Sequence, residues 1–314
     1  MDLSAEHYPI LVTGARGLLG RALGPRLARS APRPEAARLT DLAEPACPAA
    51  CLPGRGRLDV TDARAVAAAV RDLRPRTVFH LAAWTDVDGA ESHPADAERA
   101  NVAGSENVAR AAADAGALVV HISTDFVFDG MKPGAYLEDD APSPQSVYGR
   151  TKAESEARVR ASAPAHHLVV RTAWLYGAGG RNLPGRQAGF VQAILAAARE
   201  GRPLRVVADQ VGCPTWSEDL AEALLALVAA DARGTFHACG RGAASRLEMA
   251  QAILEAAGLG APVEPALTAE MPRAARRPAR AVLSTEKLER ATGFRFPPWR
   301  ESLRAFVRSL ESNA

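Results

Sequence analysis

The sequence contains little cysteine. Its four cysteines, Cys47, Cys51, Cys213 and Cys239, are unevenly spaced, so a secreted scaffold held together by disulfides is not expected. Cys47 and Cys51 have the spacing of half a metal site, but no second Cys/His pair of suitable spacing accompanies them. We therefore expect ordinary thiols and assign no metal ligands.

Long apolar runs and basic runs are also absent. No stretch of about 18 apolar residues could span a bilayer, and the first residues carry Asp2 and Glu6 without the basic region of a signal peptide. The 38 basic and 36 acidic side chains are scattered along the chain, without the basic run that neutralises a nucleic-acid backbone. We expect a cytoplasmic protein whose partner is neither a nucleic acid nor a membrane.

Short apolar runs alternate with longer helix-like stretches through the first half of the chain. YPILVTG precedes GLLGRALGPRLARS, TVFHLAA precedes AGSENVARAAADA, and ALVVHIST precedes YGRTKAESEARVRAS. Strand and helix in this alternation predict parallel strands joined by right-handed helical crossovers. The expected fold is an α/β protein with a doubly wound parallel Rossmann sheet and a smaller α/β C-terminal substrate lobe.

The alternation weakens after Trp174, which suggests a domain boundary. We expect a dinucleotide-binding Rossmann domain over residues 1–172 and mainly a substrate-binding lobe over 173–314. The strand-like GTFHACG indicates that residues of about 215–240 return to the first domain. From Ser245 onward an amphipathic helix, a proline-rich stretch and a terminal helix are predicted to form the lobe.

A glycine-rich turn follows the first predicted strand. GARGLLG places Gly14, Gly17 and Gly20 where the chain must turn tightly, approach a pyrophosphate and pack a helix against the strand. The helix that opens here, with Leu18 and Leu19 in its first turn, would direct bare N–H groups at the anion. We predict a dinucleotide-binding turn, against the alternative of a plain strand-to-helix turn.

Further residues are predicted to surround that dinucleotide. An acid after the second strand would accept hydrogen bonds from the adenosine ribose, whereas an arginine inside the turn could pair with a 2'-phosphate. Both are present, which leaves the choice between NADH and NADPH open. The remaining candidates are an acid and its neighbour near the adenine and two small residues at a strand end. In that order, these residues are Asp41, Arg16, Asp59, Val60, Ala82 and Ala83.

Tyr148 and Lys152 lie one helical turn apart in VYGRTK, so both can point into one cleft. Alone, this spacing is also typical of a surface pair. However, HISTDFVFDG places Ser123, Thr124 and Asp125 at the carboxyl end of a predicted parallel strand, where open sheets bind ligands. Reduction of a ketone by hydride leaves an alkoxide. We expect Lys152 to lower the pKa of the Tyr148 phenol, which then protonates this alkoxide while Thr124 orients the substrate oxygen.

These motifs resemble the extended short-chain dehydrogenase/reductases and, within them, the dTDP-4-dehydrorhamnose reductase family. The similar segments include GARGLLG, RPRTVFHLAAWTDVDGAE, VVHISTDFVFDG, SPQSVYGRTKAESE, VVRTAWLYG, DQVGCPT and RPARAVLSTEKL. The resemblance implies reduction of the 4-keto group of a dTDP-4-keto-6-deoxy sugar by NADPH or NADH. By the same resemblance Thr124, Tyr148 and Lys152 form the catalytic triad. Three further residues are implied as substrate contacts: Asp125 and Trp174 for the sugar and Arg277 for the diphosphate.

Some features depart from the family or leave alternatives open. Phe126 follows Asp125 where the related dehydratases carry Asp-Glu, so dehydration is disfavoured. The departure from the family is the segment from Leu183 to Gly189, which resembles an insertion beside the sugar site. Magnesium is implied by the family, but its ligands cannot be assigned here. The expected partner is a small-molecule nucleotide sugar, with a homodimer as a further option. The alternatives are an epimerase or ketoreductase for another nucleotide sugar, and a noncatalytic dinucleotide-binding subunit resembling that of methionine adenosyltransferase.

Overall fold

A computed structural model describes residues 3–32, 36–41, 56–178 and 189–312 of this chain. Its centre is a seven-stranded sheet in the order β11-β6-β5-β4-β1-β2-β3, and every pair in it is parallel. Its strands are β1 Ile10–Thr13, β2 Ala37–Asp41, β3 Gly56–Arg57, β4 Thr77–His80, β5 Leu118–Thr124, β6 His167–Thr172 and β11 Gly234–His237. The doubly wound parallel sheet predicted from the alternating pattern is confirmed.

The helices connect these strands or build the C-terminal lobe. They are α1 Leu18–Ser30, α2 Ala63–Leu73, α3 Val87–Ser92, α4 Pro94–Glu98, α5 Gly104–Asp114, α6 Val147–Ser162, α7 Phe190–Arg199, α8 Ser217–Ala229, α9 Arg246–Ala256, α10 Glu286–Thr292 and α11 Trp299–Glu311. The short helices are η1 Ala5–His7, η3 Arg99–Ala103, η4 Asp125–Val127 and η5 Thr268–Glu270, of which η3 is a π-helix and the others are 3₁₀. Within the described segments, no helix is long and apolar enough to cross a membrane.

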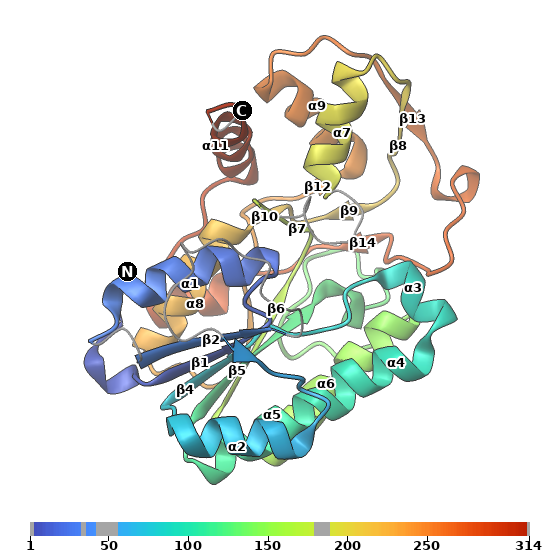
Figure 1. The fold of residues 1–314 in the computed structure, drawn as a ribbon. Helices are drawn as coiled ribbons and strands as arrows, with labels where there is room; N and C mark the ends of the chain where they lie inside the picture. The colour runs from blue at the N-terminus through green and yellow to red at the C-terminus, as the bar shows by residue number, and fades with distance from the viewer. Residues whose placement is uncertain (1–2, 33–35, 42–55, 179–188, 313–314) are drawn as a thin grey trace.

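Both faces of the sheet are covered, as the apolar strands predict. Helices α1 and α8 pack on one face, and α2, α5 and α6 pack on the other (Figure 1). Successive strand residues supply the two cores in turn: Ile10 and Val12 belong to the core under α1 and α8, whereas Leu11 belongs to the core under α2 and α5. A strand whose residues are apolar on both faces is therefore completely buried, and β1 has no exposed residue.

The strand order reverses beside β1. The chain runs from β1 outward through β2 and β3, then returns to place β4 on the other side of β1. In such sheets the crevice outside the carboxyl ends of the strands at this switch point is where ligands bind. The turn after β1, which begins with Gly14, and the segment from Leu81 after β4 therefore lie next to each other at this edge.

The C-terminal lobe has its own apolar core, formed mainly by α7, α9 and α11 (Figure 1). Its small sheets pair the strands β7 Leu175–Tyr176, β8 Leu204–Val207, β9 Val211–Gly212, β10 Thr215–Trp216, β12 Ala244–Ser245, β13 Val263–Ala266 and β14 Arg280–Ala281. Leu288 of α10 and the following Phe296 instead join the core of the main sheet. The segment around Leu288 and Phe296 therefore packs against the main sheet and not in the lobe. The domain division at residue 172 stays a prediction.

Candidate active site

The turn after β1 has the backbone geometry that its glycines require. Gly14 has φ +70°, and a Cβ at this position would lie 2.6 Å from the backbone N of Ala82. A Cβ on Gly20 would lie 2.5 Å from Cα of Ala15, so α1 could not pack this close to the turn. Gly17 is the N-cap of α1 and brings no side chain in front of the helix N-terminus. The turn is therefore a bare backbone cradle of the kind that fits an anion.

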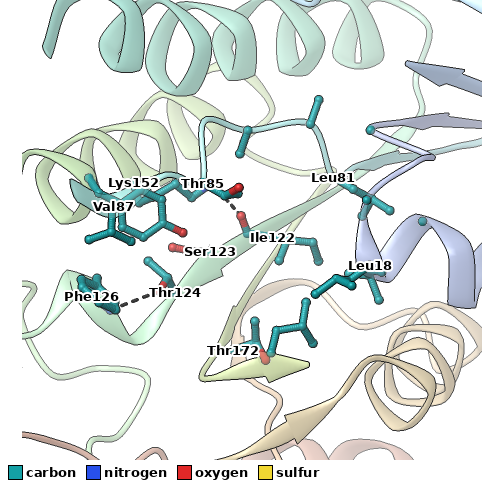
Figure 2. Close-up of a pocket in the computed structure, with 18 of the residues that line it drawn as sticks. Leu18, Leu81, Thr85, Val87, Ile122, Ser123, Thr124, Phe126, Lys152 and Thr172 are labelled. Carbon is teal, nitrogen blue, oxygen red and sulfur yellow. Dashed lines mark hydrogen bonds between the residues drawn. The ribbon is translucent and has the colours of Figure 1, made fainter. Parts of the chain in front are cut away.

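This cradle forms one end of a cavity of about 590 Å³ at the switch point. Figure 2 shows Thr124 and Lys152 on one side of the cavity and Leu18 on the other. The predicted residues that line it are Gly14, Arg16, Gly17, Leu18, Leu19, Gly20, Val60, Ala82, Ala83, Thr124, Asp125, Tyr148, Lys152 and Trp174. The fold therefore joins the glycine turn to the Tyr148 and Lys152 pair, which are far apart in the sequence.

Helix α6 places Tyr148 and Lys152 on the same wall. Its N-cap Ser146 accepts a hydrogen bond from the backbone N of Gly149 at 3.1 Å, which sets where the helix begins. Lys152 Nζ donates to the backbone oxygen of Ile122 at 2.7 Å. Burial lowers the pKa of Lys152 to about 8, so the amine is still mainly protonated at neutral pH.

Two buried histidines lie behind Lys152. His121 Nε2 is 3.3 Å from Lys152 Nζ and 2.9 Å from Ser155 Oγ, and its ring stacks on that of His80 at 5.4 Å. His80 in turn contacts Thr13 Oγ1 at 2.8 Å. Burial lowers the pKa of His80 to about 3 and also lowers that of His121, so neither ring is charged at neutral pH. These rings support the wall as neutral hydrogen-bonding groups.

The environment of Tyr148 corrects one expectation. We expected Lys152 to lower the pKa of the phenol, but burial raises it to about 12, the hydrogen bond with Thr124 opposes that rise, and the charge of Asp125 adds to it. The physical reason is that burial destabilises the charged phenolate by more than the surrounding groups stabilise it. Tyr148 therefore holds its proton at neutral pH and can act only as a donor until negative charge develops beside it.

Thr124 is the last residue of β5, Asp125 directly follows it, and both line the cavity. Thr124 Oγ1 donates to Asp125 Oδ1 at 2.9 Å and accepts from the backbone N of Phe126 at 3.2 Å. Burial raises the pKa of Asp125 to about 6, which leaves the carboxylate mostly ionised at neutral pH. The Thr124 hydroxyl must turn away from Asp125 before it can donate to a ligand.

Trp174 lines the cavity just beyond the end of β6. Its backbone has φ +43°, a value that residues other than glycine rarely adopt. The indole ring packs against Gly212, where an added Cβ would lie 2.5 Å from Nε1 of the ring. Arg246 lies over this ring with Cζ 3.5 Å from its centroid. Arg246 was not among the residues predicted from the sequence, because a single arginine at the start of a helix carries no signal of what the fold will place beside it.

Other predicted residues lie elsewhere. Asp59 does not line the cavity: its Oδ1 accepts hydrogen bonds from the N and Oγ1 of Thr61 at 2.9 and 2.8 Å and so stabilises the turn before α2. Asp41 is the last residue of β2, and its side chain lies outside the described part of the structure. Cys47 and Cys51 and the segment from Leu183 to residue 188 also lie outside it. The nucleotide contacts of Asp59 and Asp41 stay predictions.

Arg277 lies at a second cavity of about 420 Å³, together with Arg273 and Arg276. Its guanidinium is already engaged, because its two terminal nitrogens donate to the two carboxylate oxygens of Asp88 at 3.1 and 2.8 Å. The predicted diphosphate contact of Arg277 stays a prediction. Among the described residues, no three His, Cys, Asp or Glu side chains are grouped as a metal site would need.

Comparison with known proteins shows which family this chain is similar to. Residues 8–312 match the sequence model of the family described as RmlD substrate binding domain. A dTDP-4-dehydrorhamnose reductase of Sinorhizobium fredii is 42% identical over 268 residues, which cover 82% of this chain and 88% of that protein.

Solved structures of similar proteins cover almost the whole chain. A dTDP-4-dehydrorhamnose reductase of Clostridium acetobutylicum has a TM-score of 0.84 and 35% identity, covering 96% of this chain and 99% of that one. The Bacillus anthracis enzyme in complex with NADP has a TM-score of 0.83 and 32% identity, covering 96% and 98%. This chain therefore belongs to the dTDP-4-dehydrorhamnose reductase family of NAD(P)-dependent oxidoreductases.

Proposed function

We propose that this protein reduces the 4-keto group of a dTDP-4-keto-6-deoxy sugar, converting dTDP-4-dehydrorhamnose to dTDP-rhamnose with NADPH or NADH. The observation that carries the proposal is the single cavity that joins the glycine cradle to Thr124, Tyr148 and Lys152. The names of the similar proteins supply the substrate, because nothing in the cavity itself identifies a deoxy sugar.

The residues present fit a nicotinamide dinucleotide. Gly14, Gly17 and Gly20 would hold its pyrophosphate at the N-terminus of α1, and Ala82 and Ala83 would lie against the nucleotide. Arg16 also lines the cavity and is suitably charged for a 2'-phosphate. When bound, the dinucleotide supplies the hydride for the carbonyl carbon.

Tyr148 is the proposed proton donor. As the carbonyl carbon gains hydride its oxygen becomes an alkoxide, and the phenol transfers its proton to that oxygen, leaving a phenolate. An alkoxide is more basic than the phenolate even with the pKa of Tyr148 at about 12, so this transfer is downhill. The ammonium of Lys152 on the same helical face stabilises the phenolate, and Thr124 turns its hydroxyl from Asp125 to the substrate oxygen.

The test of this function is the oxidation of NADPH and NADH, followed by near-ultraviolet absorbance, with a panel of nucleotide 4-ketosugars. We expect turnover with dTDP-4-dehydrorhamnose and a new axial or equatorial hydroxyl at C4 by NMR. Oxidation with a differently substituted 4-ketosugar alone would assign another ketoreductase. If the protein binds both dinucleotides and oxidises neither with any member of the panel, the noncatalytic subunit is the better description.

The close packing of the glycine turn leads to a prediction about NADPH affinity. Gly14→Ala should weaken NADPH binding by at least about tenfold, because its Cβ would displace the Ala82 backbone at the site of the dinucleotide. Fluorescence titration of NADPH measures this change. Gly116→Ala is the matched control, since Gly116 also has a positive φ, +66°, but no atom lies within 4 Å of its added Cβ. Unchanged NADPH affinity in Gly14→Ala would show that the dinucleotide lies elsewhere.

A further inference from the structure

Arg246 is the first residue of α9, and its position there is fixed by a capping box. Ser245 Oγ accepts from the backbone N of Glu248 at 3.0 Å, and Glu248 Oε2 accepts from the backbone N of Ser245 at 2.7 Å. The carboxylate of Glu248 is therefore used by the helix start. A cation at this end of a helix is unfavourable, because the N-terminus already carries partial positive charge.

Aromatic rings hold the guanidinium in one place. Arg246 Cζ lies 3.5 Å from the centroid of the Trp174 ring and 5.2 Å from that of Phe190. Trp174 is itself fixed by the space that Gly212 leaves for its ring. Stacking on a ring face occupies the face of a guanidinium and leaves its N–H edge available for hydrogen bonds.

That edge has no partner within the ranges that the structure describes. The Arg246 side chain makes no hydrogen bond or ion pair there, although it is only partly exposed and lines the cavity. Asp125 is the one acid among the described residues that line the cavity; its charge interacts favourably with that of Arg246, although the two side chains form no direct ion pair or hydrogen bond. Burial lowers the pKa of Arg246 to about 10, so the guanidinium stays charged at neutral pH. A partly buried guanidinium without a directly hydrogen-bonded partner is costly, and an anionic ligand would remove that cost.

The other cations near the site have assigned positions. Arg16 belongs to the glycine turn and lines the cavity, and Lys152 donates a hydrogen bond to the Ile122 carbonyl. Arg277, the residue implied by family resemblance, is held in a bidentate pair by Asp88. Arg246 thus has available donors, and its electrostatic interaction with Asp125, the residue after Thr124, places it near the residues predicted to act on the sugar.

We propose that Arg246, stacked on Trp174, binds the sugar-proximal phosphate of the nucleotide diphosphate and thereby positions the sugar at Tyr148. This inference rests on the proposed function, because it takes the substrate to be a nucleoside diphosphate sugar. A guanidinium edge matches two phosphate oxygens with parallel hydrogen bonds. The phosphate nearest the sugar is the relevant one, because Arg246 lines the same cavity as the groups that act on the sugar.

The test compares dTDP with dTMP, which lacks the sugar-proximal phosphate, as ligands of the NADP-loaded protein in calorimetry. Wild type should bind dTDP more tightly than dTMP. Arg246→Gln should weaken dTDP binding by about 10–100-fold, the loss of charge-assisted hydrogen bonds, and change dTMP binding by less than about threefold. The substrate KM should rise in proportion to the dissociation constant of dTDP, while the affinity for NADPH stays within about threefold.

Several results would overturn this inference. Equal losses of dTDP and dTMP affinity in Arg246→Gln would indicate a general structural role, and unchanged dTDP affinity would exclude contact with the diphosphate. Loss of the dTDP preference in Arg277→Gln, with Arg246→Gln unaffected, would assign that role to Arg277. Arg246→Lys keeps the charge and serves if the glutamine variant is unfolded; it should retain part of the dTDP preference. Failure of wild type to reduce any nucleotide 4-ketosugar would instead contradict the proposed function.

Discussion

Tyr148→Phe should lower kcat by about 10²–10⁴-fold, the usual contribution of a positioned proton donor. The variant keeps the ring, so the edge-to-face contact with Phe126, with centroids 5.5 Å apart, is preserved. The lost hydroxyl is the proposed proton donor to the alkoxide, and at neutral pH it holds its proton because burial raises its pKa. Steady-state oxidation of NADPH with the 4-ketosugar measures the change, and titration should show NADPH affinity within about threefold of wild type.

Tyr8→Phe is the matched control for this substitution. Tyr8 Oη donates to the backbone oxygen of Leu27 at 2.9 Å in the main core, away from the cavity. Removing its hydroxyl should cost about 1 kcal/mol of stability and leave kcat unchanged. Normal turnover by Tyr148→Phe would refute the proton-donor role, whereas equal losses in both variants would mean that the assay reports folding.

Glu156→Gln should destabilise the fold by about 3–5 kcal/mol, because it leaves the charge of Arg171 buried without its partner. The carboxylate is completely buried, and Arg171 donates to both of its oxygens at 2.9 and 2.8 Å. Ser123 Oγ donates to the same carboxylate at 2.6 Å. This network joins β5, β6 and α6, the elements that position the active site. Urea denaturation, with the midpoint and slope fitted together, measures the loss.

Glu154→Gln is the matched control on the same helix. Glu154 pairs with Arg158 at 2.8 Å, but both side chains are 49% exposed, so removal of this pair should cost less than about 0.5 kcal/mol. The double variant Glu156→Gln with Arg171→Met should recover part of the loss, because it removes the uncompensated charge. A cost for Glu156→Gln as small as that for Glu154→Gln would show that the buried pair contributes little.

The same pair predicts a dependence on acid. Burial raises the pKa of Glu156, but the hydrogen bonds of Arg171 and Ser123 and the charges of Arg171 and Arg160 together outweigh it, so the pKa in the folded protein is lower than its ordinary value of 4.5. A carboxyl group with a depressed folded pKa contributes stability above its unfolded pKa and loses it as pH falls toward the folded value. Wild type should therefore lose more stability than Glu156→Gln between pH 5 and lower pH. Parallel urea midpoints against pH would contradict this.

Much of the site could be predicted because the relevant signals are local. Gly20 is required by its close contact with the backbone of Ala15 in the same turn, and Tyr148 and Lys152 share a helical face through their spacing alone. Arg277 shows the limit of such reasoning. It occurs in a motif, but its engagement depends on Asp88, which is far away in the sequence and nearby only in the folded chain.

The packing of the C-terminal region shows the same limit. Leu288 and Phe296 are apolar and are therefore expected to be buried, and the sequence predicts them to belong to the lobe. In the structure they join the core of the main sheet. Periodicity identifies which residues are buried, but it does not tell which of two apolar cores will receive them.

The amino-acid order alone determined the parallel sheet, the anion cradle and the placement of Tyr148 and Lys152 on one helix, because alternation, turn geometry and helical period act between near neighbours. Tertiary structure decided the raised pKa of Tyr148, the pairing of Arg277 and the stacking of Arg246 on Trp174. Desolvation and charge pairing depend on which distant side chains meet and how far water is excluded, and only the packed chain sets both.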